Sequence, residues 1–89
     1  MVFNNNFKLL INEIIKKASL FGLPQIDVDI ANGYIDYNEC GLALEHIADQ
    51  LFEFDIKIDE PFYHSILSVA DKMVIERNQF DFLKKLVEG

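Results

Sequence analysis

The stretch Glu39–Ile58 constrains the fold more than any other part of the chain. Its sequence is ECGLALEHIADQLFEFDIKI. Apolar residues recur in it at the i, i+3, i+4, i+7 spacing of a helix face that is buried against other helices. These residues are Leu44, Ile47, Ala48, Leu51 and Phe54. The pattern predicts an amphipathic helix that supplies a central part of the core.

The opposite side of the same helix is acidic. Glu45, Asp49 and Glu53 follow one another at i, i+4, i+8, and we call these three residues the acidic ribbon. They cover roughly 80° of the helix surface. No Lys or Arg lies among them, although like charges at i, i+4 cost about 0.2–0.5 kcal/mol per pair. The ribbon is expected to be exposed, either as a solvated face or as a binding surface.

The composition favours a single helical domain over residues 1–89. The chain is 51% apolar and has eight Phe, which is typical of a folded protein and not of a disordered acidic segment. Its two Pro and four Gly are too few for an all-β fold, which needs a turn every 8–12 residues or so. We therefore predict an all-α fold, a compact bundle of four to five short helices.

Helical spacing also appears before and after the central stretch. Apolar residues from Phe7 to Phe21 predict a first helix, which Gly22 and Pro24 end. Asp59 is a predicted N-cap for a later helix. The stripe expected to be buried in that helix is Tyr63, Ile66, Leu67, Ala70, Met73 and Val74, and a short last helix offers Phe80, Leu83, Leu86 and Val87. Between the central and later helices, Ile56 and Ile58 are expected to turn inward from an extended segment.

Residues 26–37 fit two structures. Alternation of Ile26, Val28 and Ile30 with acids, followed by Asn32-Gly33, is the pattern of a β-hairpin. A helix is also consistent, with Pro24 in its first turn and a stripe formed by Ile26, Ile30, Tyr34 and Tyr37. We predict the helix, because an isolated two-stranded ribbon is marginal in water. A loop starting at Asp27 does not match the EF-hand pattern, since Asn38 occupies the twelfth position, where a bidentate Glu is required.

The charge is concentrated in the middle of the chain. The net charge is −7, and residues 18–70 carry ten acids against one base, Lys57. This distribution is unfavourable for binding to nucleic acid or to an anionic membrane surface, and it favours a basic partner. No apolar run approaches the length of a membrane span, and the N-terminal sequence does not resemble a signal peptide, so we expect a cytoplasmic protein.

The sequence offers no constellation typical of an enzyme or of a metal site. His46 is expected on the exposed flank of the central helix and His64 in the first turns of the next. Neither has a nucleophile or a ligand cluster at a recognisable spacing, and no Gly-rich phosphate loop is present. Cys40 is the sole cysteine, so it is either structural or, at a helix start, a slightly activated thiol. We predict a non-enzyme without cofactor or metal.

Part of the central stretch resembles a known family. Glu39, the run Gly41-Leu42-Ala43-Leu44-Glu45, the run Leu51-Phe52-Glu53-Phe54-Asp55-Ile56 and Ile58 are similar to the signature of Maf-type (MafI) immunity proteins. The similarity extends loosely over residues 26–76. The family pattern often has Tyr where this chain has Phe52 and Phe54. Members are small helical antidotes to secreted or contact-delivered bacterial toxins, similar in role to contact-dependent growth inhibition immunity proteins.

The resemblance implies tight stoichiometric binding of a cognate toxin domain. Such toxins are commonly nucleases with basic clefts, which an acidic surface complements. The residues expected to bind the toxin are Glu45, Asp49 and Glu53, extended by Asp36, Glu39 and Asp55, with Tyr34 or Tyr37 as rim anchors. Two other functions compete with this one, namely an acidic protein-interaction adaptor without a toxin partner and a small carboxylate-dependent hydrolase.

Overall fold

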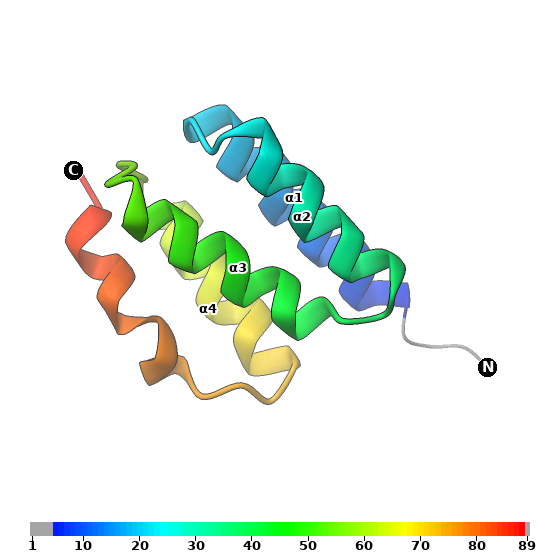
Figure 1. Ribbon diagram of the computed structural model, residues 1–89. Helices are drawn as coiled ribbons and strands as arrows, with labels where there is room; N and C mark the ends of the chain where they lie inside the picture. The colour runs from blue at the N-terminus through cyan, green and yellow to red at the C-terminus, as the bar shows by residue number, and fades with distance from the viewer. Residues whose placement is uncertain (1–4, 89) are drawn as a thin grey trace.

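The computed structural model describes residues 5–88 and confirms an all-α bundle (Figure 1). Its elements are α1 (Asn5–Phe21), α2 (Gln25–Asp36), α3 (Cys40–Glu53), α4 (Glu60–Lys72) and the 3₁₀-helix η1 (Arg77–Leu86). In Figure 1, α2 lies in front of α1 and α3 lies in front of α4. Helix α1 contacts the other three α-helices, and η1 packs on α3 and α4. The radius of gyration is 12.1 Å, as expected for a compact chain of this length.

The core lies between these helices and includes residues from all five. Its fully buried large side chains are Ile11, Leu44, Ile47, Leu51, Ile58, Phe62, Ile66, Phe80, Leu83 and Leu86. Ile58 is buried as predicted, and Ile56 is half-buried. The Ile58 N–H donates to the Leu86 carbonyl at 3.0 Å, and the Glu88 N–H donates to the Ile58 carbonyl at 2.9 Å. This short parallel bridge attaches the end of the chain to the α3–α4 connection.

The helical prediction for residues 26–37 is confirmed, because Asn32 and Gly33 lie inside α2. The residues that α2 buries differ from the stripe that the sequence suggested. Val28, Ala31 and Ile35 face the core, whereas Ile26, Ile30 and Tyr37 are exposed and Tyr34 is half-buried. Both sets have helical spacing, so periodicity within α2 alone could not decide which of them faces inward.

Each of the four α-helices ends in the same hydrogen-bonded cap. The residue in the left-handed conformation is Gly22 after α1, Asn38 after α2, Asp55 after α3 and Val74 after α4. The next N–H donates to a carbonyl five residues earlier, as in a Schellman motif. These bonds are Leu23 to Ala18 (3.0 Å), Glu39 to Tyr34 (2.8 Å), Ile56 to Leu51 (2.9 Å) and Ile75 to Ala70 (2.9 Å).

The caps explain two wrong burial predictions. Phe54 and Val74 were both expected in buried helical stripes, but Phe54 is 52% exposed and Val74 is 90% exposed. Helix α3 ends at Glu53 and α4 ends at Lys72, so the helical periodicity no longer applies to these two residues. The predicted cap at the start of α4 is confirmed, since the Asp59 side chain accepts a hydrogen bond from the Phe62 N–H at 2.9 Å.

Candidate functional site

The outer face of α3 carries the acidic ribbon. Helix α3 buries Ala43, Leu44, Ile47, Ala48 and Leu51. With that side fixed against the core, the three carboxylates of the acidic ribbon point to solvent, and all three residues are exposed. None of the ion pairs found among the described residues involves these carboxylates. None of the three carboxylates is therefore held in an ion pair with a Lys, Arg or His of the described residues.

The other predicted acids lie at the two ends of the ribbon. Asp36 and Glu39 are exposed at the α2–α3 turn, which brings them next to the start of α3. Asp55 is exposed just beyond the other end, but its carboxylate is 3.0 Å from the Lys57 ammonium. Because this pair partly neutralises Asp55, its contribution to a negative surface is smaller than the sequence suggested.

The two predicted tyrosine anchors differ in their surroundings. Tyr37 is 81% exposed and free to meet a partner. Tyr34 is half-buried on the side of α2 that faces α3, and its ring centroid lies 6.2 Å from that of His46. Tyr34 therefore helps to pack α2 on α3, and Tyr37 is the more accessible of the two.

Three apolar side chains on or next to this face are exposed, although they were not predicted to be surface residues. Leu42 and Phe52 are each 43% exposed, and together with Glu45 and Asp49 they follow an i, i+3, i+7, i+10 line along α3. The Phe52 ring meets Phe82 of η1 edge-on at a centroid distance of 5.2 Å, which holds it in place. Phe54 is exposed just after the helix. The i+3 spacing of Leu42 and Phe52 from the ribbon acids was the signal that could have identified them.

His46 is not the surface residue that the sequence predicted. Its Nε2 lies 3.0 Å from an Asp27 carboxylate oxygen, and the exposed fractions of the two side chains are 20% and 5%. Asp27, in the first turn of α2, is the buried charged residue of the core. A buried carboxylate needs such a partner, because it has lost its water. The pair fixes how α2 and α3 sit against each other.

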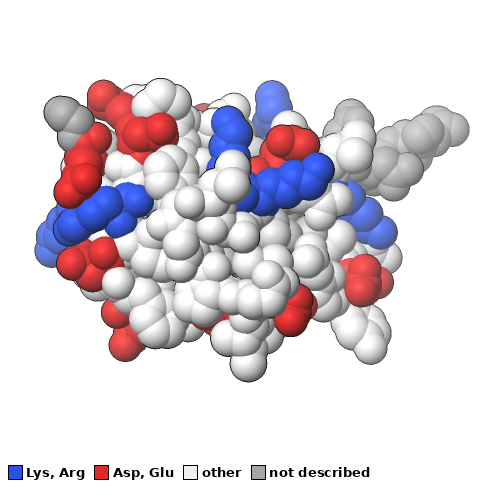
Figure 2. Space-filling view, turned by 90° about the horizontal axis from the view of Figure 1, so that it is seen from above, with Lys and Arg blue, Asp and Glu red and all other residues white. Residues whose placement is uncertain are grey.

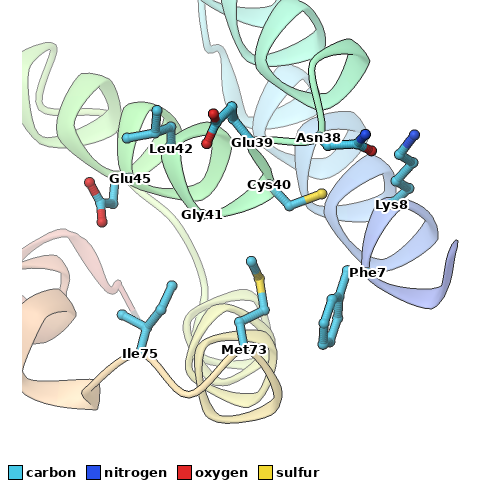
Figure 3. A pocket seen from close by; sticks show the side chains of 10 residues that line it. All are labelled: Phe7, Lys8, Asn38, Glu39, Cys40, Gly41, Leu42, Glu45, Met73 and Ile75. Carbon is cyan, nitrogen blue, oxygen red and sulfur yellow. The ribbon is translucent and has the colours of Figure 1, made fainter. Parts of the chain in front are cut away.

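A hollow of about 580 Å³ adjoins the start of the ribbon. Phe7, Met73 and Ile75 give it apolar walls, and Glu39 and Glu45 lie along its edge. Figure 3 shows Met73 and Ile75 pointing toward the first turn of α3, with the Glu45 carboxylate above Ile75. Apolar walls beside carboxylates suit a long aliphatic side chain that ends in a cation, as in Arg or Lys.

Cys40 also lines this hollow, close to Lys8. Burial raises the pKa of the Cys40 thiol, and the positive charge of Lys8 opposes this effect in part. The thiol is therefore not the activated nucleophile that a helix start can produce. His64, the second histidine, is exposed and lies 3.7 Å from Glu60 on the surface of α4.

Within residues 5–88, no group of three or more His, Cys, Asp or Glu side chains is arranged to hold a metal ion. The same part of the chain contains no helix with the length and apolar character that crossing a bilayer requires. Comparison with protein-family models, with curated proteins and with solved structures gave no match.

Proposed function

We propose that this protein is an immunity protein that neutralises a cognate bacterial toxin, a nuclease domain, by tight stoichiometric binding through the outer face of α3. The observation that carries the proposal is the acidic ribbon, three exposed carboxylates that form no ion pair with any of residues 5–88. A nuclease cleft is basic because it binds phosphates, so the ribbon complements it in charge.

Two further features support binding over catalysis. Leu42 and Phe52 give the acidic face apolar anchors that a solvated surface does not need. Neither histidine is set beside a nucleophile, since His46 is bonded to Asp27 and His64 faces Glu60. Residues 39–58, which form α3 and the segment after it, resemble the immunity-protein signature. This resemblance supports a toxin as the binding partner.

The test is the affinity for the toxin domain encoded directly upstream, measured by calorimetry at two salt concentrations. Asp49→Lys reverses the central charge of the ribbon and leaves the core untouched, because Asp49 is exposed. Truncating one member of a buried charge pair costs roughly 2–5 kcal/mol, and a solvated pair costs less. We therefore expect a loss of affinity between several-fold and several thousand-fold, depending on how dry the contact is.

Glu13→Lys on α1 is the matched control. It makes the same change in net charge, and Glu13 has only an exposed contact with Lys16 at 3.9 Å to lose. Wild-type affinity should persist in this variant. An Asp49→Lys protein that binds as well as wild type, with no response to salt, would place the interface elsewhere. A locus without a toxin gene would instead favour the adaptor.

A further inference from the structure

Helix α2 is apolar on two sides, and only one of them is covered. Val28, Ala31 and Ile35 are buried against the bundle. On the outer side, Ile26 is 67%, Ile30 40% and Tyr37 81% exposed. Ile26 and Ile30 are i, i+4 neighbours about 40° apart around the helix, and Tyr37 follows them at the residue that caps the C-terminal end of α2. We call these three residues the outer row of α2.

The tertiary structure prevents the outer row from turning inward. The 3.0 Å contact between Asp27 and His46 fixes the rotation of α2 about its axis. Turning the helix so that Ile26 and Ile30 faced the core would break this contact and move the buried Asp27 carboxylate. The row is therefore a constant feature of the surface, next to the α3 face, because Tyr34 and Asp27 on α2 both meet His46 on α3.

The charges around the row determine what can cover it. Asp29 and Asp36 flank it on α2, the acidic ribbon lies across on α3, and no Lys or Arg occurs between Lys17 and Lys57. In Figure 2, the lower edge is the side that faces the viewer in Figure 1, and it shows acidic and uncharged atoms without basic ones. A second copy of the chain would oppose acid to acid. A partner with apolar side chains surrounded by Lys or Arg would meet complementary charge.

The outer face of α3 is too small to form a stable interface by itself. Helix α3 has 14 residues, so it is about 21 Å long and roughly 10 Å wide with its side chains. Its outer face is too small to supply the roughly 800 Å² that each partner contributes to a stable interface. The neighbouring face of α2 is also acidic, so it is the surface that can extend the interface beyond α3.

We infer that the outer row of α2 is the apolar half of the partner-binding surface, and that it receives apolar side chains of the toxin while the ribbon on α3 meets the surrounding cations. This inference rests on the proposed function and adds the second helix and the apolar character of the contact. Apolar anchors mainly set the dissociation rate, whereas exposed charges mainly set the association rate.

The experiment measures association and dissociation rates for the upstream-encoded toxin domain by surface plasmon resonance. Ile26→Gln and the double variant Ile26→Gln/Ile30→Gln keep the helix, because Gln has a helix propensity at least as good as that of Ile. We expect dissociation to accelerate at least about tenfold in the double variant, with association within about twofold of wild type. Leu9→Gln is the matched control, since Leu9 is 64% exposed on α1 and should show wild-type rates.

The outcomes separate the two proposals. If wild type binds and Asp49→Lys weakens binding but the double variant keeps wild-type rates, the inference about α2 is wrong and the proposed function stands. If wild type does not bind the toxin domain, both are wrong. Sedimentation of the free protein tests the other occupant, because a dimer that becomes monomeric in the double variant would assign the row to self-association.

Discussion

The Asp27–His46 contact offers the sharpest test of how this fold is held together. His46→Ala removes the imidazole and leaves the carboxylate of Asp27, which is 5% exposed, without its partner at 3.0 Å. Stranding one member of a fully buried pair costs about 3–5 kcal/mol. Because the His46 side chain is 20% exposed, water can reach the site, and we expect a smaller loss of about 2–3 kcal/mol in the free energy of unfolding.

Urea denaturation followed by circular dichroism at 222 nm gives this free energy directly. The melting temperature should fall by about 10–20 °C, since 1 kcal/mol corresponds to roughly 4–8 °C in a domain of this size. The matched control is His64→Ala, which removes an exposed histidine 3.7 Å from Glu60. Its effect should remain within about 0.5 kcal/mol.

A double-mutant cycle with Asp27→Ala separates the pair from the packing of the imidazole. With no carboxylate left to strand, His46→Ala should cost at least about 1 kcal/mol less in the Asp27→Ala background than in wild type. Two results would refute the reasoning. One is a cost for His46→Ala no larger than that of the His64→Ala control, and the other is strict additivity in the cycle.

Further predictions concern the cap after α4 and the thiol at the start of α3. Val74→Gly should raise the free energy of unfolding by about 1 kcal/mol. Val74 is a β-branched residue at φ 60°, and the left-handed conformation costs such residues about 1–2 kcal/mol. Urea denaturation measures this free energy, and a variant less stable than wild type would contradict the prediction. Cys40 should react more slowly with iodoacetamide at pH 7.5 than an exposed thiol, since burial raises its pKa and lowers its thiolate fraction. Lys8→Ala should slow the reaction further, because the charge that lowers the pKa is lost, and a faster reaction would show that access controls the rate instead.

The sequence by itself determined the all-α class, the order of the helices and the exposed acidic side of α3. These properties follow from local periodicity and from signals that act within one turn. Asp59 caps α4 as predicted, and Glu45, Asp49 and Glu53 are all exposed, because carboxylates that lack partners remain in water whatever the neighbouring helices do.

Only the tertiary structure decided which side of α2 is buried and where the helical stripes end. Helix α2 has two apolar rows, and the choice depends on a partner 19 residues away, His46, which accommodates Asp27 inside the bundle. Phe54 and Val74 continue the apolar periodicity in the sequence, yet both are exposed. Helix α3 ends at Glu53 and α4 ends at Lys72, and the left-handed residues Asp55 and Val74 turn the chain away from each helix axis. Burial is a property of the packed set of helices, whereas periodicity describes each helix alone, so a helix with two apolar sides is resolved only when its neighbours are in place.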